Sequence, residues 1–323
     1  MERIGTVRFT LYNGDSYHKY QIEKGLHIMT KRRFYIVDVF AEQRYAGNQL
    51  AVVRDAEGLS GDEMLTIARE MNYSETTFIL SDTMKDGGYD VRIFTMASEV
   101  PFAGHPTLGT AYILNNEIAD KPSARIALNL KAGQIPVTFN DDGVLWMRQN
   151  APEFGHVFDA ETVAKALQVS PDDLDSRFPV QSVSTGLPFI IAPLKSLDAV
   201  RRAEVDLPKF DAMIGAVDDP LKADAILVFC PEAYHDGNDI TARCFVHHHG
   251  AVEDPATGSA NGCLAGYLTK YRYFGSDVVD CRVGQGFYIN RPSLLMLKAK
   301  DTGNTIEVNV GGRVMMVARG ELV

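Results

Sequence analysis

Residues 92–114 read RIFTMASEVPFAGHPTLGTAYIL, and residues 243–268 read RCFVHHHGAVEDPATGSANGCLAGYL. Each stretch begins with an arginine two residues before a phenylalanine, in a run typical of a strand. An acidic residue and a short loop of Gly and Pro follow, and an apolar segment of small residues ends the stretch. A helix that is apolar on most faces is typical of a position surrounded by other elements. The repeat predicts two related domains, each with a strand layer or barrel wrapped around one central helix.

The segments around this repeat mix strands and helices without regular alternation. Residues 34–40 and 91–95 are β-branched and aromatic runs that predict strands. Ser60 and Glu63 have the spacing of a capping box, and apolar residues at helical spacing follow them. This order favours the α+β class over a doubly wound sheet. A polar stretch with a proline at 150–155 is the predicted linker between the domains.

The charge of the chain sets a further boundary near the start. There are 32 Lys and Arg against 42 Asp and Glu in 323 residues, a net charge of −10. Residues 1–33 carry seven basic and three acidic side chains, so this segment is +4 and the remainder is −14. We therefore treat residues 1–28 as an N-terminal extension that need not be ordered. Residues 29–150 form the first predicted domain and residues 151–323 the second, with a last strand at 314–318 that can return to the first.

Composition and motifs exclude several classes of function. An acidic surface disfavours nucleic acid as a partner, and no apolar run is long enough to span a membrane. Four cysteines without a CxxC pair favour a reduced, cytoplasmic compartment. The chain has no GxGxxG after a strand, no Walker A motif and no GxSxG elbow. The histidines at 247–249 lack the further ligands that a metal site needs, so we predict no metal. A small molecule is the expected partner.

The two loops of the repeat each open a predicted helix. A helix start leaves backbone N–H groups free at the positive end of the helix dipole, where a carboxylate or phosphate binds readily. Two such starts, one from each domain, can converge on a cleft between domains. The alternative is that these loops only cap their helices, as most helix starts do.

Three titratable residues are candidates for proton transfer in these loops and beside them. His105 and Asp254 lie at corresponding places in the two copies, and Glu75 lies at a helix-to-strand junction. Asp254 precedes a proline and also fits an ordinary helix cap, whereas histidine caps poorly. Glu75 taken alone also fits a solvated loop acid.

At residues 104–106 and 253–260 the sequence resembles the PhzF-like family, which is named for a phenazine-biosynthesis isomerase and has the diaminopimelate-epimerase fold. The resemblance extends from Phe34 to Val323. Further matching blocks lie at residues 35–40, 47–48, 71–78, 184–189, 285–286 and 291–293.

The resemblance implies an activity and a set of site residues. Glu75 matches the catalytic acid/base, which passes a proton between two positions of a small unsaturated cyclic carboxylic acid and needs no cofactor. His105 matches the first loop of the site, and Asp254 matches a residue that holds or orients the substrate. A homodimer is also implied. The remaining matches are Gly104 in the first loop and the amides of Gly258 and Ser259, which would receive the substrate carboxylate.

Two other functions remain open at this point. The related epimerases and racemases use two thiols, but neither 103–105 nor 255–257 contains a cysteine, and Cys244 and Cys263 lie near the second loop alone. A two-thiol racemase is therefore disfavoured, whereas a racemase or epimerase of amino-acid-like substrates that uses carboxylate and imidazole groups is not. The other alternative is a small-molecule or protein-binding module with little catalysis.

Overall fold

The structure is a computed structural model that describes residues 5–12, 17–24 and 31–323. Within the predicted N-terminal extension, β1 (Gly5–Tyr12) and β2 (Tyr17–Lys24) form an antiparallel pair. The other residues of the extension lie outside the described residues. The prediction that the extension need not be ordered therefore falls outside the described residues at these positions.

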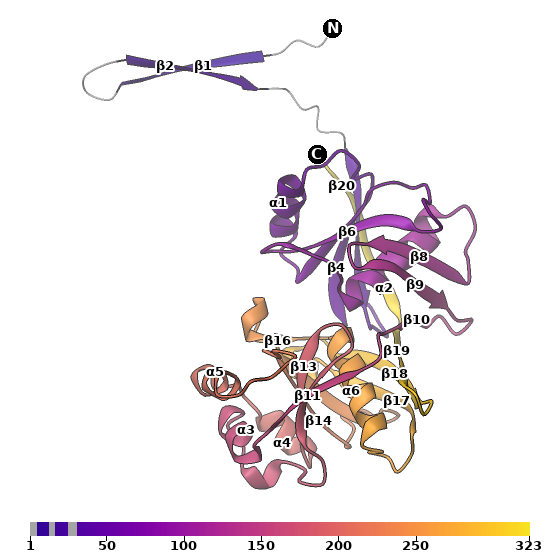
Figure 1. Ribbon diagram of the computed structural model, residues 1–323. Coiled ribbons are helices and arrows are strands. Elements are labelled where there is room, and N and C mark those ends of the chain that lie inside the picture. Colours follow the sequence, from indigo (N-terminus) through magenta and orange to yellow (C-terminus); the bar gives the residue numbers. More distant parts are fainter. Residues whose placement is uncertain (1–4, 13–16, 25–30) are drawn as a thin grey trace.

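The chain beyond the extension forms two groups of strands, one above the other in Figure 1. The first half contains β3 (Arg32–Val39), β4 (Asn48–Val53), β5 (Glu75–Ile79), β6 (Tyr89–Thr95), β7 (Glu99–Val100), β8 (Arg125–Leu130), β9 (Gly133–Phe139), β10 (Leu145–Arg148) and the last strand, β20 (Val314–Leu322). The second half contains β11 (Glu153–Phe158), β12 (Val180–Ser184), β13 (Pro188–Pro193), β14 (Ile226–Cys230), β15 (Ile240–Phe245), β16 (Glu253–Asp254), β17 (Val278–Gln285), β18 (Ser293–Asp301) and β19 (Ile306–Gly312).

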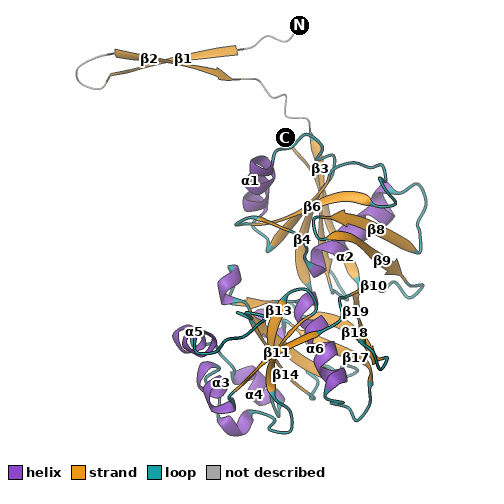
Figure 2. Cartoon of the chain, viewed as in Figure 1, coloured by secondary structure: helices purple, strands orange, loops and turns teal. Residues whose placement is uncertain are grey.

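Helices complete each half. The α-helices are α1 (Gly61–Met71), α2 (Gly104–Ile113), α3 (Ala160–Ala166), α4 (Leu197–Arg202), α5 (Leu207–Gly215) and α6 (Gly258–Lys270). A π-helical turn and three 3₁₀ turns are η1 (Leu114–Ile118), η2 (Pro171–Asp173), η3 (His247–His249) and η4 (Phe287–Ile289). Strands outnumber helices throughout (Figure 2), and this mixture confirms the α+β class.

The strands pair in one order in both halves. In the first half, β20 pairs with β3, and the order continues through β4, β5, β6, β8, β9 and β10, with parallel pairs at β4–β5 and β6–β8. In the second half the order is β11, β12, β13, β14, β15, β17, β18 and β19, with parallel pairs at β13–β14 and β15–β17. Because β10 also pairs with β19, one continuous set of hydrogen bonds links the halves.

Each half packs its strands around one helix. α2 contacts β3, β4, β5, β8, β9, β10 and β20, and every residue of α2 except Tyr112 is buried. α6 contacts β12, β13, β17, β18 and β19, and every residue of α6 except Lys270 is buried. This agrees with the prediction of two apolar, small-residue helices surrounded by other elements. The capping box predicted at Ser60 and Glu63 is also present, at the start of α1. Within the described ranges, no helix is long and apolar enough to cross a membrane.

Candidate active site

The two central helices begin without a side-chain cap. The N-cap residue is Ala103 for α2 and Thr257 for α6, and neither side chain accepts a hydrogen bond from the helix amides. In each of the other four α-helices of the described chain, a Ser or Asp side chain caps the first turn. Those capping residues are Ser60, Asp159, Ser196 and Asp206. The amides at the two central starts are therefore available to an anion.

These two uncapped starts touch each other. A Cβ atom on Gly104 would lie 3.4 Å from the backbone nitrogen of Ser259. One on Gly258 would lie 3.7 Å from Cα of Gly104 and 3.1 Å from Cζ of Phe40. The two helix starts are thus within van der Waals distance of each other, and the tight contact of a Cβ atom on Gly258 would be with Phe40. The positive ends of two helix dipoles meet at this point.

Glu75 and His105 face each other beside the start of α2. Glu75 is the first residue of β5, and His105 lies in the first turn of α2. Oε2 of Glu75 and Nε2 of His105 are 3.5 Å apart, and both atoms are buried without a hydrogen-bond partner. The Glu75 side chain still keeps 19% of its surface exposed, so part of it is accessible from outside. Buried polar atoms are seldom left unbonded, so this pair calls for a functional explanation.

Burial moves the pKa values of this pair in opposite directions. It raises the pKa of Glu75 to about 8, and the nearby Asp254 carboxylate adds to that shift. It lowers the pKa of His105 to about 3, against the effect of a hydrogen bond with the backbone of Gln49. Since Nε2 of His105 has no partner, the ring nitrogen that bonds Gln49 is Nδ1. At pH 7 an uncharged carboxyl group therefore lies beside an uncharged imidazole, whose Nε2 can accept a hydrogen bond.

Asp254 is held by hydrogen bonds at the start of α6. Oδ1 accepts from Nδ2 of Asn48 at 2.9 Å, and Oδ2 accepts from Oγ1 of Thr257 at 2.6 Å. Nε2 of Gln285 donates to the Asp254 backbone oxygen at 2.9 Å, while its Oε1 accepts from Nδ2 of Asn261 at 2.8 Å. Burial raises the pKa of Asp254, and the bonds from Thr257 and Asn48 oppose that shift. Asp254 is thus buried like Glu75 but fixed in place.

The structure brings the predicted residues together and adds two that the sequence did not single out. The six predicted residues are Glu75, Gly104, His105, Asp254, Gly258 and Ser259, and they gather where β5, α2, β16 and α6 meet. The additional residues are Asn48 of the first half and Gln285 of the second half, which both bond to Asp254. Both belong to short motifs, Gly47–Asn48 and Gln285–Gly286, but those motifs alone give no partner.

The nearby thiols and histidines do not add chemistry to this pair. Cys244 and Cys263 are buried, and burial raises the pKa of both thiols, that of Cys263 to about 12. His248 and His249 each pair with an aspartate on the surface of the second half. Among the described residues, no group of three or more His, Cys, Asp or Glu side chains could hold a metal ion.

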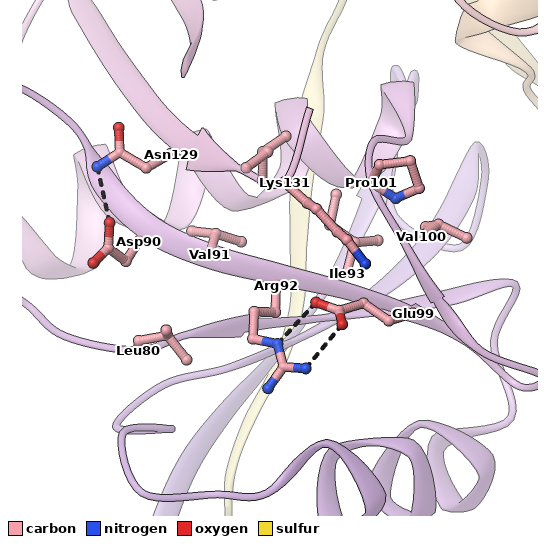
Figure 3. Close-up of a pocket in the computed structure, with 11 residues that line it drawn as sticks. Leu80, Asp90, Val91, Arg92, Ile93, Glu99, Val100, Pro101, Asn129 and Lys131 are labelled. Carbon is pink, nitrogen blue, oxygen red and sulfur yellow. Dashed lines mark hydrogen bonds and ion pairs between the residues drawn. The ribbon is translucent and has the colours of Figure 1, made fainter. Parts of the chain in front are cut away.

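A pocket of about 230 Å³ lies elsewhere in the first half (Figure 3). It is lined by Arg92, Glu99 and Lys131 together with residues of β6 and β8. Arg92 donates to both carboxylate oxygens of Glu99, at 2.8 and 2.9 Å. None of the six predicted site residues lines this pocket, so it is separate from the helix starts.

Comparison with known proteins places this arrangement in a family. The sequence profile described as phenazine biosynthesis-like protein matches residues 37–320. The chain belongs to the phenazine biosynthesis-like family. An uncharacterized isomerase of Clostridium acetobutylicum is 33% identical over 309 residues, which are 92% of this chain and 99% of that protein. The trans-2,3-dihydro-3-hydroxyanthranilate isomerase of Pseudomonas aeruginosa is 33% identical over 301 residues, 89% of this chain and 98% of that protein.

A solved structure of the phenazine biosynthesis-like family agrees with the fold. The PhzF-family phenazine biosynthesis protein of Bacillus anthracis superposes with a TM-score of 0.82 at 28% identity, over 91% of this chain and 100% of that one. These matches confirm the predicted family and the isomerase class. They leave the roles of the individual site residues as predictions.

Proposed function

We propose that this protein isomerises a small cyclic or unsaturated carboxylic acid by moving a proton between two of its carbons, with Glu75 as the general acid/base. The observation that carries the proposal is the buried, unbonded pair of Glu75 Oε2 and His105 Nε2, 3.5 Å apart at an uncapped helix start. A carboxyl group whose pKa is raised to about 8 can both take and return a proton near neutral pH.

In the proposed reaction, ionised Glu75 removes a proton from one carbon of the substrate. The electron pair of that C–H bond enters the conjugated system, and the same carboxyl group returns the proton to another carbon. The composition of the substrate is unchanged. Neutral His105 presents Nε2 as an acceptor for an N–H or O–H group of the substrate, because its Nδ1 is bonded to Gln49.

The substrate carboxylate is proposed to bind between the two helix starts. The amides of Gly258 and Ser259 offer local positive potential in a protein whose net charge is −10. Asp254 stays charged beside this position and orients a donor group of the substrate. The compound that names the Pseudomonas relative, trans-2,3-dihydro-3-hydroxyanthranilate, carries a carboxylate, an amino group and a hydroxyl group, and is the first substrate to test.

The test is the Glu75→Gln variant, which keeps the shape of the side chain and removes the base. Conversion of trans-2,3-dihydro-3-hydroxyanthranilate in D₂O, followed by NMR, should fall by roughly 10²- to 10⁴-fold. The matched control is Glu99→Gln, the same change at another partly buried carboxylate of the first half, which should convert substrate at the wild-type rate. Undiminished conversion by Glu75→Gln would refute the proposal.

The same assay separates the alternative functions. A binding module would bind the compound without converting it or exchanging its protons. A racemase or epimerase would instead invert amino-acid-like substrates, which chiral chromatography detects.

We also infer that the two halves are copies of one unit, with boundaries near residues 29–150 and 151–323 and with β20 in the first. The identical order of parallel and antiparallel pairs along β3–β10 and β12–β19 supports this. So do two equivalent ion pairs, Arg92–Glu99 and Arg243–Glu253. The homodimer that the family resemblance implies is a further proposal, which sedimentation equilibrium can test.

A further inference from the structure

Asn48 connects the first half of the molecule to the acid of the second half. Its side chain is 2% exposed, and Nδ2 uses both of its hydrogens. One bond goes to Oδ1 of Asp254 at 2.9 Å and the other to the backbone oxygen of Ala256 at 3.0 Å. Asn48 begins β4, whereas Asp254 and Ala256 precede α6. A single amide thus fixes both the carboxylate and the backbone of the second loop.

The backbone turn before Asn48 is fixed in position, and from it the Asn48 amide reaches residues of the second half. Gly47 has φ +67, and a Cβ atom there would lie 2.3 Å from the Val39 oxygen, so only glycine fits. Nε of Arg291 donates to the Gly47 oxygen at 2.9 Å, and the Gly47 nitrogen donates to the Pro292 oxygen at 3.0 Å. The turn before Asn48 is therefore clamped by residues of the second half.

Gln49, the residue after Asn48, interacts with the His105 side chain that faces Glu75. The backbone of Gln49 bonds to His105 and so selects which ring nitrogen faces Glu75. Consecutive residues of β4 therefore touch both members of the proposed machinery.

We propose that Asn48 is a positioning residue that keeps the Asp254 carboxylate ionised and in place, and thereby sets the charge beside Glu75. This inference rests on the proposed function. The ionisable groups that interact with Asp254 are Glu75 on β5, Cys244 on β15 and Glu253 on β16, the last paired with Arg243. His105 on α2 lies 3.5 Å from Glu75. None of these groups donates a hydrogen bond to the Asp254 carboxylate; within the described chain that role belongs to Asn48 and Thr257.

The test is Asn48→Leu, which keeps a similar side-chain volume and removes both donors. The carboxyl resonance of Asp254, assigned with Asp254→Asn in protein carrying ¹³C-labelled aspartate, is titrated without substrate. We expect its midpoint to move to higher pH, because a carboxylate that loses a donor is protonated more easily. With trans-2,3-dihydro-3-hydroxyanthranilate as substrate, kcat should fall about 10- to 100-fold with a smaller change in KM.

The matched control is Asn115→Leu. Asn115 is also a buried asparagine of the first half, and its amide bonds Ser123 in both directions. This variant should lose stability without moving the Asp254 midpoint or lowering kcat. If Asn48→Leu does not fold, the exchange Asn48→Asp with Asp254→Asn restores the bond between positions 48 and 254 but not the bond to Ala256. It moves the charge, and should recover part of the stability without recovering kcat.

The outcomes separate the two claims. A folded Asn48→Leu with an unchanged Asp254 midpoint overturns the positioning role, whatever the enzyme does to substrate. Turnover that survives Glu75→Gln overturns the proposed function instead, even where the Asp254 midpoint moves as expected.

Discussion

The starts of α2 and α6 are alike in position and differ in how their acids are bonded. Both helices are buried, both lack a side-chain cap, and they touch at Gly104 and Gly258. Oε2 of Glu75, beside α2, has no hydrogen-bond partner, whereas both carboxylate oxygens of Asp254, beside α6, accept a hydrogen bond. Under the proposed function, the acid left unbonded is the one that exchanges the proton, and the bonded acid supplies charge at a fixed position.

The two halves also differ in the Arg–Glu ion pair that precedes each central helix in the sequence. Arg92 on β6 pairs with Glu99 next to the open pocket of the first half (Figure 3). Arg243 on β15 pairs with Glu253 and also donates through Nη1 to three backbone oxygens of 200–203, at the end of α4. The same motif is thus solvent-accessible in one half and covered by a helix in the other. Water therefore reaches the Arg92–Glu99 pair more readily than the Arg243–Glu253 pair.

The largest expected effect is a difference in kcat between variants of Glu75 and Asp254. Glu75→Gln should reduce kcat by about 10³-fold, because it removes the group that moves the proton. Asp254→Asn should reduce kcat by about 10- to 100-fold, because an amide keeps polar contacts but not the charge. Steady-state turnover of trans-2,3-dihydro-3-hydroxyanthranilate measures both. Equal losses would show that the two acids share the proton transfer, which would contradict the separate roles of Glu75 and Asp254.

The next effect separates the two arginines. Arg243→Met should destabilise the fold by about 3–5 kcal/mol, because it leaves Glu253 buried without its partner. Arg92→Met should cost about 1 kcal/mol, because water can reach Glu99. Urea denaturation of both variants gives the difference. Similar losses would mean that α4 does not protect the second pair.

The free energy of unfolding should depend on pH through the ionisation of Glu75. Its folded-state pKa lies above its ordinary value, so its contribution to stability is complete below pH about 4.5 and is lost as pH rises to about 8. His105 has the opposite sign, because its lowered pKa costs stability as pH falls from about 6.5 toward 3. Relative to wild type, Glu75→Gln should gain on the order of 2–4 kcal/mol between pH 4.5 and 8. Urea titrations at several pH values test this, and a pH-independent difference would contradict a buried, neutral Glu75.

The smallest expected effect concerns helix caps. Asp159→Ala should cost about 1 kcal/mol of stability and leave turnover unchanged, because Asp159 only caps α3. Thr257→Ala should lower turnover, because the Thr257 hydroxyl bonds Asp254 instead of capping α6. Thermal melts and turnover assays on both variants decide this. If Thr257→Ala lost stability but kept its turnover, Thr257 would act only in the stability of the helix start.

The sequence was informative where structure is local. The capping box at Ser60 and Glu63 and the two small-residue helices follow from short-range patterns. The family resemblance added Glu75, which no local pattern separates from a solvated loop acid.

The contacts that complete the site could not be predicted in the same way. Asn48 and Asp254 are 206 positions apart, and their bond depends on how the two halves pack. The burial of Glu75 likewise depends on elements from both halves, so the direction of its pKa shift follows only from the assembled fold. The bond from Arg291 to the Gly47 oxygen likewise joins residues that are far apart in the sequence.

The most direct test of the central claim is the pH dependence of kcat/KM for trans-2,3-dihydro-3-hydroxyanthranilate, which reports the ionisation of the free enzyme. If ionised Glu75 removes the proton, kcat/KM of the wild type rises with pH and levels off above pH about 8, and the rise is absent from any residual activity of Glu75→Gln. A wild-type profile that is flat between pH 6 and 9, or a Glu75→Gln variant with the wild-type profile, would contradict the role of Glu75.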